Sequence, residues 1–303
     1  MTSGGLNLKA VRPRRLSREK LLGGIAPLIP TIAIWSMVGF LFPWFLYMMF
    51  HEYTAGAMES PRFAGVANFI KLARDVRFWT AVGRTAYYSG VGTSIQVLLG
   101  LIIALALVKF IKSDKLRLVL LIFYLTPMMI SEAVSSHIWL MLATPQGYLN
   151  SILRGLGLPA LPWIGPELAL TTIMIADIWQ WTSLPLLIIY AARLSIPQSL
   201  YEAAKLDEAS DWMILRQITL PYLKTPILIA ALLRFMDSYK FIDKVLLMTY
   251  GGPGYASETL GFYVYQVSFT YRYLGYSGLL GLVVAFGVGG VLLIFWRVFR
   301  GGR

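Results

Sequence analysis

The chain has 303 residues, of which 57% are hydrophobic and only 14% are charged. Soluble domains carry roughly 25% charged residues, so this composition excludes an ordinary soluble protein and favours a membrane protein. The net charge of +12 does not indicate binding to nucleic acid, because the basic residues are spread over short hydrophilic segments. The absence of cysteine excludes disulfides and thiolate metal sites, and the two histidines form no metal motif, so we expect no metal centre.

Six apolar stretches follow a basic N-terminal tail, residues 1–22, and precede a short tail, residues 299–303. A membrane helix needs roughly 20 mostly apolar residues, so we predict an all-α integral membrane protein with a single six-span domain, residues 23–298. Pro127 and Pro185 lie where they can interrupt the third and fourth spans. The predicted spans are 23–49, 85–108, 118–141, 168–190, 226–249 and 277–298.

The distribution of lysine and arginine predicts the orientation of these spans. Seventeen of them fall on the side of the two termini and seven on the opposite side, while the other three lie within the fifth span. Because short cytoplasmic loops carry an excess of basic residues, both termini and the loop 191–225 are predicted to be cytoplasmic. The first span lacks a small-residue cleavage site, so we interpret it as a retained signal anchor.

Residues 62–82 precede the second span and have apolar residues close to helical spacing, with charges on the opposite face. This pattern is typical of a helix that lies flat on a membrane surface. We therefore predict an amphipathic helix at the outer surface.

The loop 191–225, which we call the coupling loop, is far longer than a chain needs to reverse direction at a membrane. Pro197 suits the first turn of a helix, and the residues after it are good helix formers. Ala203 and Ala204 have small side chains, so another surface can approach one face of this helix closely. Glu202 offers a carboxylate to a basic residue of a partner. From the residues alone, the helix either docks a partner or braces the bundle.

A second helix is expected in the coupling loop. Ser210 is a candidate N-cap, and Trp212, Leu215 and Ile218 are expected to face inward. Pro221 is expected to end this helix, and Pro226 to mark the return to the membrane.

The coupling loop contains a specific motif. It reads Glu-Ala-Ala from Glu202, then three residues, then Glu208, then nine residues, and then Ile218-x-Leu220-Pro221. This motif resembles the cytoplasmic loop of permease subunits of binding-protein-dependent ABC importers, except that the family has glycine where Glu208 stands. The segment from Asp237 to Thr259, with its Gly-Gly-Pro sequence, is similar to permeases of the carbohydrate and glycerol-phosphate type, in particular the maltose-type first permease of a pair.

The resemblance, which runs from about Gly65 to the C-terminus, implies the six-helix bundle of a type I importer permease in a bacterial inner membrane. It implies a sugar, polyol or glycerol-phosphate-like solute and several partners: a second homologous permease, two cytoplasmic ATP-binding subunits, an extracytoplasmic substrate-binding protein and the surrounding lipid. The coupling loop would dock in a cleft of an ATPase, with Glu202 as its charged contact. The residues assigned to this coupling are Glu202, Ala203, Ala204, Asp207, Glu208, Ile218, Leu220 and Pro221.

The sequence contains no GxxxxGK[ST] motif and no Gly-Lys pair at all. It therefore cannot bind nucleotide through a P-loop. We expect a non-enzymatic subunit without a cofactor of its own, while ATP and magnesium are used by the separate ATPase.

Charged residues inside the predicted spans need a partner or a water-filled path, because burial in lipid costs at least about 2.5 kcal/mol per charge. In the fifth span, Arg234, Asp237, Lys240, Asp243 and Lys244 place opposite charges three or four residues apart, as in a self-neutralising ladder. The other interpretation is that such residues line the translocation path. The candidates for a substrate path are Glu132, Asp177, Trp179, Gln180, Trp181, Asp237, Tyr239 and Lys240.

Two other classes of function remain to be weighed. An ion-coupled secondary transporter would explain the charges of the fifth span, but six spans are few and no second internal half is visible. A polytopic membrane enzyme would need His, Asp or Glu clustered at one depth, and the sequence shows no such cluster.

Overall fold

The computed structural model describes residues 28–56 and 60–301, and these residues are mostly helical. The N-terminal tail, residues 1–22, and the last two residues lie outside the described part of the chain. In chain order the elements are α2 (Ile29–Met48), β1 (His51–Glu52), β2 (Arg62–Phe63), α3 (Ala67–Arg74), α4 (Val76–Phe110), α5 (Asp114–Met129), α6 (Glu132–Ala143), α7 (Tyr148–Gly155), α8 (Ala169–Trp181), α9 (Ser183–Leu194), α10 (Gln198–Leu206), α11 (Asp211–Ile214), the π-helical turn η2 (Leu215–Thr219), α12 (Leu220–Tyr239), the π-helical turn η3 (Val245–Thr249), α13 (Leu260–Tyr265), the π-helical turn η4 (Gln266–Thr270) and α14 (Leu274–Gly301).

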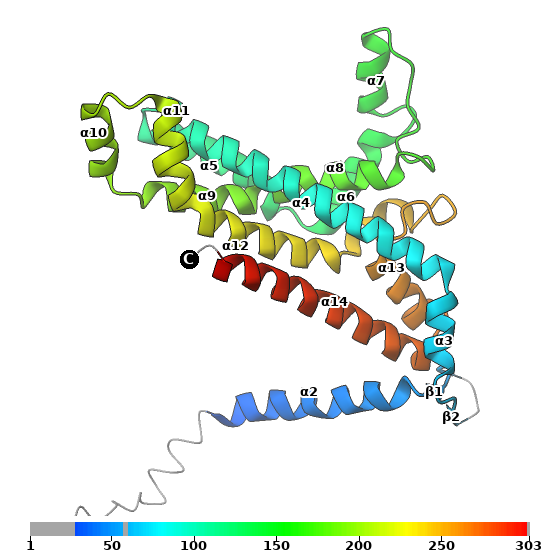
Figure 1. Cartoon of the computed structure of the whole chain (residues 1–303). Coiled ribbons are helices and arrows are strands. Elements are labelled where there is room, and N and C mark those ends of the chain that lie inside the picture. The colour runs from blue at the N-terminus through cyan, green and yellow to red at the C-terminus, as the bar shows by residue number, and fades with distance from the viewer. Residues whose placement is uncertain (1–27, 57–59, 302–303) are drawn as a thin grey trace, which may run out of the picture.

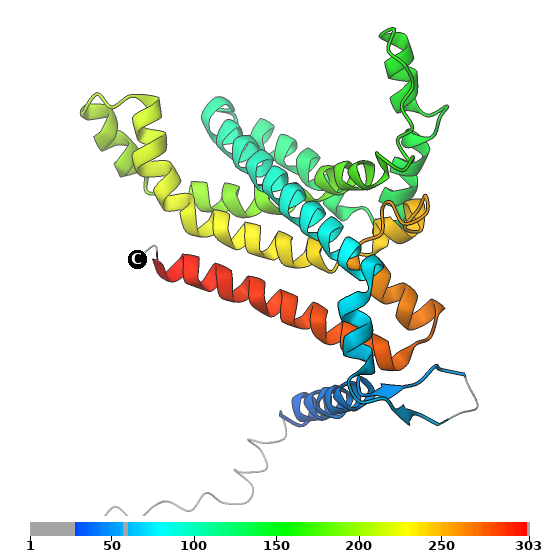
Figure 2. The ribbon, with the colours of Figure 1, turned by 45° about the vertical axis from the view of Figure 1, so that its right-hand side comes forward.

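The long helices form an elongated, splayed bundle (Figure 1). Helix α4 packs chiefly against α9 and α12, and α14 runs beside α12. Helix α2 diverges from the bundle and contacts α14 near the short hairpin of β1 and β2 (Figures 1 and 2). Helices α10 and α11 lie at one end of the bundle, and α3, α7 and α13 lie at the other.

Four described helices are long and apolar enough to cross a membrane, and a bent pair of helices is a fifth candidate. Helix α2 has 20 residues and covers most of the predicted first span. The count of six spans and the sidedness of the termini therefore stay predictions. The candidate spans are Val76–Phe110, Ala169–Leu194, Asp211–Tyr239, Leu274–Arg297 and the pair Asp114–Met129 and Glu132–Gly155.

The amphipathic helix predicted at 62–82 is shorter than expected. It is limited to α3, and α4 begins at Val76, nine residues before the predicted span. The cause is Asp75, whose extended backbone separates the two helices and whose carboxylate accepts a hydrogen bond from the Phe78 amide at 3.0 Å. Residues 76–82 thus belong to a membrane helix.

Asp75 also ties the start of α4 to α13 and α14. Its carboxylate accepts hydrogen bonds from the hydroxyls of Tyr263 and Tyr276. Burial raises the pKa of Asp75, but the hydrogen bonds from Tyr263, the Phe78 amide and Tyr276 outweigh burial, so its pKa lies below the ordinary value. The carboxylate is therefore held in its charged, accepting form.

The predicted third span, 118–141, is broken near Pro127. Helix α5 ends at Met129, and α6 starts after Ser131, whose hydroxyl accepts a hydrogen bond from the Val134 amide. The two helices are bent by 95°. The break lies after the proline, at Ile130 and Ser131, whose backbones are extended, and the Ser131 cap fixes the start of the new helix.

The predicted fifth span, 226–249, has the wrong boundaries. The helix runs from Asp211 through η2 and ends at Tyr239. Pro221 does not end the second helix of the coupling loop, because it lies in the first turn of α12, directly after η2. A wider π-helical turn leaves room for the proline ring that a regular helical turn would not.

Candidate functional site

The first helix of the coupling loop ends in a tight hydrogen-bonded turn. The amide of Glu208 donates to the carbonyl of Lys205 at 3.1 Å, and the amide of Ala209 donates to the carbonyl of Ala204 at 2.9 Å. Glu208 has a φ of +55°, in the left-handed region. These bonds define a Schellman motif, which usually has glycine at this position. Glu208 thus adopts a conformation that usually belongs to glycine.

The second helix of the coupling loop begins as predicted. The hydroxyl of Ser210 accepts a hydrogen bond from the Met213 amide at 3.3 Å, which confirms Ser210 as the N-cap. Trp212, however, does not face inward: it is exposed, and the apolar contacts of this helix come from Ile214 and Ile218. The inward position of Ile218 is therefore confirmed, while that of Trp212, which was predicted from spacing alone, is wrong.

The coupling loop is anchored to the bundle through Tyr201. Its ring is buried in a core cluster with Leu107 and Leu223, and the guanidinium of Arg193 lies 4.3 Å from the ring centre. Its hydroxyl shares a hydrogen bond of 3.1 Å with the hydroxyl of Thr219 in η2. Since both partners are buried, α10 is linked directly to the start of the long helix α12.

A groove of about 320 Å³ separates α10 from α11 and η2. Among the residues assigned to coupling, Ala203, Ala204, Asp207 and Ile218 line this groove. Glu202 is exposed on α10 but does not line the groove. Leu220 and Pro221 belong to the first turn of α12 and do not line the groove.

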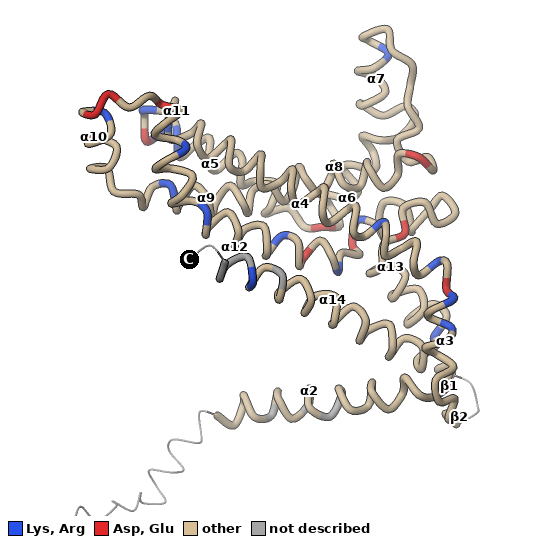
Figure 3. The backbone as a smooth tube through the Cα atoms, viewed as in Figure 1, with Lys and Arg blue, Asp and Glu red and all other residues tan. Residues whose placement is uncertain are grey.

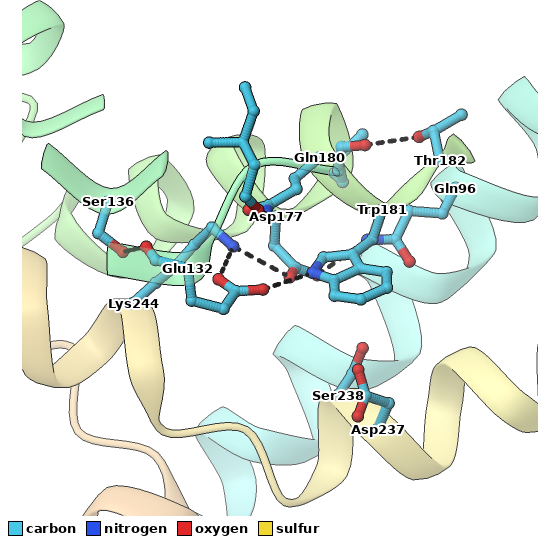
Figure 4. A network of polar contacts seen from close by, with 12 residues as sticks. Gln96, Glu132, Ser136, Asp177, Gln180, Trp181, Thr182, Asp237, Ser238 and Lys244 are labelled. Carbon is cyan, nitrogen blue, oxygen red and sulfur yellow. Dashed lines mark hydrogen bonds and ion pairs between the residues drawn. The ribbon is translucent and has the colours of Figure 1, made fainter. Parts of the chain in front are cut away.

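A second candidate site, the central cluster, lies among α4, α6, α8, α12 and the chain just before η3 (Figure 4). Arg234 of α12 is fully buried and donates hydrogen bonds to four side chains, one of which is Ser238 at 3.2 Å. It donates hydrogen bonds to Gln96 Oε1 at 2.8 Å, to Asp177 Oδ2 at 3.0 Å and to Asp237 Oδ2 at 2.8 Å. The central cluster consists of Gln96, Glu132, Asp177, Trp181, Arg234, Asp237, Ser238 and Lys244.

Lys244 is the second buried cation of the central cluster. Its ammonium contacts Glu132 Oε2 at 2.5 Å and lies 3.8 Å from Asp177 Oδ1. The other oxygen of Glu132 accepts a hydrogen bond from the Trp181 indole at 2.7 Å. Charges far apart in sequence are thus neutralised between helices.

Of the ion-pair ladder predicted within the fifth span, only the first pair forms, and the rest of the prediction is wrong. Arg234 and Asp237 do pair three residues apart, but α12 ends at Tyr239. Lys240 and Asp243 are exposed, and within the described residues neither forms an ion pair. Lys244 pairs with α6 and α8 instead, because the chain leaves the helix before reaching it.

The carboxylates of the central cluster differ in exposure. The Asp177 side chain is buried, whereas those of Glu132 and Asp237 are 24% and 46% exposed. Within the described part of the chain, Asp177 Oδ1 and Gln180 Oε1 are buried without a hydrogen-bond partner. Three carboxylates face two buried cations, so the exposed edge of the cluster carries the excess negative charge.

Five of the eight residues predicted for a substrate path lie in or beside the central cluster. Gln180 donates to the carbonyl of Ile130 at 2.8 Å, at the bend between α5 and α6. The other three residues lie elsewhere: Trp179 packs against Trp139, Tyr239 stacks on Phe235, and Lys240 follows the end of α12. The five are Glu132, Asp177, Gln180, Trp181 and Asp237.

Gln96 was not among the predicted site residues. Its amide nitrogen donates a hydrogen bond to Asp177, and its amide oxygen accepts one from Arg234. A lone amide in the middle of an apolar span is a signal that could have identified it, since polar groups in a membrane need partners. Arg234 and Lys244 were noticed as charges, but their partners on other helices could not be read from spacing. Across the described residues, no group of three His, Cys, Asp or Glu side chains could hold a metal ion.

The chain matches the family model of the binding-protein-dependent transport system inner membrane component over residues 96–299. It is 31% identical over 299 residues to a probable ABC transporter permease protein of Sinorhizobium fredii, covering 96% of this chain and 95% of that protein. It is 32% identical over 266 residues to the trehalose/maltose transport system permease protein MalF of Thermococcus litoralis, covering 86% and 87%.

Solved structures share the fold. One chain of a bacterial ABC transporter involved in the import of the acidic polysaccharide alginate matches with a TM-score of 0.75 at 22% identity, covering 94% of this chain and 96% of that chain. The matched family and the apolar helices make this a multi-pass protein of the inner membrane. The chain belongs to the family of inner membrane components of binding-protein-dependent transport systems.

Proposed function

We propose that this chain is the transmembrane subunit of an ATP-driven importer for a sugar, polyol or glycerol-phosphate-like solute, and that it is coupled to a separate ATPase through the coupling loop around Glu202. The observation that carries the proposal is the geometry of α10, which is exposed, tightly terminated and joined to α12 through Tyr201 and Thr219. The relatives named for trehalose and maltose transport support the carbohydrate class of solute.

A coupling element must be rigid to transmit force. The Schellman turn at Glu208 fixes the direction of the chain after α10, and the Ser210 cap fixes the start of the next helix. A push on α10 would therefore move α12 instead of deforming the loop. Since α12 also carries Arg234 and Asp237, it connects the coupling loop to the central cluster.

The central cluster is proposed to form one wall of the translocation path. A charged side chain exposed at membrane depth requires water or a polar solute beside it, which applies to Glu132 and Asp237. Trp181 adds an aromatic surface, and such surfaces beside polar groups suit sugars. This chain would provide half of the path, and a second homologous permease would provide the other half.

The remaining partners follow from the same proposal. Two cytoplasmic ATP-binding subunits would bind and hydrolyse ATP with magnesium, so this chain needs no cofactor of its own. An extracytoplasmic binding protein would deliver the solute. The side of the bundle that carries α10 is then cytoplasmic.

Replacing Glu202 with lysine tests the coupling role. Glu202→Lys is expected to leave the protein folded but to abolish most ATP-driven uptake and co-purification of the ATPase, because the exposed carboxylate would become a repulsive charge. The matched control is Glu167→Lys, the same change at an exposed position in the connection between α7 and α8, outside the coupling loop. Unchanged uptake in the Glu202 variant would contradict the role of this residue.

The driving force is tested in vesicles that contain the complete transporter. Uptake is expected to require ATP and to persist after ionophores collapse the ion gradients. The reverse result would instead support an ion-coupled secondary transporter, for which the buried charges of the central cluster would be the place to seek the coupling ion.

A further inference from the structure

Helix α7 projects sideways from the bundle at the end opposite the coupling loop (Figures 1 and 2). It is part of the segment 144–168, which connects the end of α6 to the start of α8. Helix α8 begins the candidate span Ala169–Leu194, while α6 and α7 together form the second arm, Glu132–Gly155, of the bent candidate pair. Helix α7 is therefore the end of that arm farthest from the bend. The axis of α7 runs across the direction of α4, α12 and α14 in both views.

The fold holds α7 firmly in this position. The buried side chain of Asn150 donates to the carbonyls of Thr144 and Leu161 and accepts from the Leu161 amide and the Trp163 indole, at 2.9 to 3.3 Å. Gly147 permits the entry turn, because a Cβ atom there would lie 2.4 Å from the Leu142 carbonyl oxygen. These hydrogen bonds give the segment a defined conformation, because every polar atom of the buried Asn150 amide group has a partner.

One face of α7 is apolar and exposed. Tyr148 and Ile152 of α7 and Leu156, the residue that caps its C-terminal end, follow each other at four-residue intervals and are 75%, 60% and 70% exposed. Successive members are rotated by only about 40° around the helix axis, so they share one face. Arg154 lies on the opposite side of the helix, and α7 contains no carboxylate.

We propose that α7 is an interfacial helix whose apolar face, formed by Tyr148, Ile152 and Leu156, inserts into the boundary between lipid headgroups and acyl chains. The basic side, with Arg154, then faces the phosphates and water. This arrangement fits helices that lie in the membrane plane, which have an apolar face and basic residues on the polar face. The inference goes beyond the proposed function and holds whichever solute is transported.

The position and composition of α7 favour lipid as the occupant. Met141, in the last turn of α6, is also exposed, so the apolar surface continues from a candidate membrane span into the α7 face. Tyr148 and Trp163 are of the aromatic types that gather at membrane interfaces. A soluble partner would leave three large apolar side chains in water whenever it dissociated, whereas a bilayer covers them permanently.

The absence of cysteine from the chain makes the test direct, because single-cysteine variants carry no background label. Tyr148→Cys and Ile152→Cys place a nitroxide label on the apolar face, and Ser151→Cys and Arg154→Cys serve as matched controls on other faces of the same helix. The full-length protein is reconstituted in vesicles of phosphatidylethanolamine and phosphatidylglycerol. Power-saturation electron paramagnetic resonance then measures label collisions with oxygen, which partitions into acyl chains, and with a water-soluble nickel chelate.

The ratio of oxygen to nickel accessibility is expected to be several-fold higher at positions 148 and 152 than at 151 and 154. A high nickel accessibility at all four positions would overturn the proposal, because the helix would then stand in water. An immobilised label at 152 that neither reagent reaches would also overturn it and would indicate a protein partner. Elution of each labelled variant at the volume of the parent protein establishes that the variants are folded.

Discussion

The coupling loop and the central cluster are both rich in charged residues, but they differ in how far those charges are buried. In the coupling loop the charges are exposed and the anchor, Tyr201, is buried. In the central cluster the cations are buried and paired with carboxylates from other helices. The charges gathered at the α10–α11 end of the bundle and those along its interior are visible in Figure 3. Exposed charges can contact a partner protein, whereas the buried charges already form ion pairs that hold the helices together.

The difference in burial sets how much each kind of charge contributes to stability. Breaking a buried ion pair by removing one member typically costs about 3–5 kcal/mol, since the other charge stays buried without compensation. An exposed ion pair, such as Lys109 with Asp211 at the edge of the coupling loop, contributes little to stability, because water and salt screen it. The comparison therefore predicts that stability is sensitive to the central cluster and transport is sensitive to both regions.

The largest effect is expected for Arg234→Met. The substitution leaves the buried Asp177 without its closest cation and removes the hydrogen bond to Gln96, so a loss of about 3–5 kcal/mol is expected. The midpoint of thermal unfolding in detergent measures this loss. Lys240→Met is the matched control, because Lys240 is exposed close by in sequence and forms no ion pair among the described residues. Equal midpoints for the two variants would contradict the distinction between the two regions.

The sequence allowed the class of fold to be predicted well, for a simple physical reason. Long apolar stretches of membrane helices are a strong signal, and the helices α4, α8 with α9, and α14 lie close to predicted spans. Helix interruptions were less predictable. The third span is broken near Pro127 as expected, but the break lies after the proline instead of at it. The π-helical turn η2 let the helix continue through Pro221, where proline chemistry predicted an end.

The two candidate sites also differ in how far they could be predicted from the sequence. The coupling loop is local in sequence, so its motif and its Ser210 cap could be recognised. The central cluster joins residues up to 138 positions apart, such as Gln96 and Arg234, and spacing within one helix cannot reveal such pairs. The ladder was therefore predicted from local spacing, and the structure replaces most of it with contacts between helices.

A smaller effect is expected from loosening the anchor of the coupling loop. Tyr201→Phe removes the hydrogen bond to Thr219 and leaves a buried hydroxyl unpaired, which should destabilise the protein by about 1 kcal/mol. Tyr222→Phe is the matched control, because Tyr222 is exposed on the adjoining helix. If α10 moves α12 through this bond, ATP-driven uptake falls in the Tyr201 variant more than the small stability change explains. Equal uptake in the two variants would mean that the bond does not transmit the motion.

The smallest effect is expected at Glu208, and it has the opposite sign. A left-handed conformation costs a residue other than glycine about 1–2 kcal/mol, and glycine recovers part of this cost while losing more chain entropy on folding. Glu208→Gly is therefore expected to raise stability by about 0.5–1 kcal/mol, measured as a rise in the unfolding midpoint. Glu208→Ala removes the same charge but keeps the strain, so it should bring no such gain. A Lys205→Gly variant, in the right-handed last turn of α10, should lose stability instead. If Glu208→Gly behaved like Lys205→Gly, the left-handed turn would be wrong, and with it the rigidity on which coupling through α10 depends.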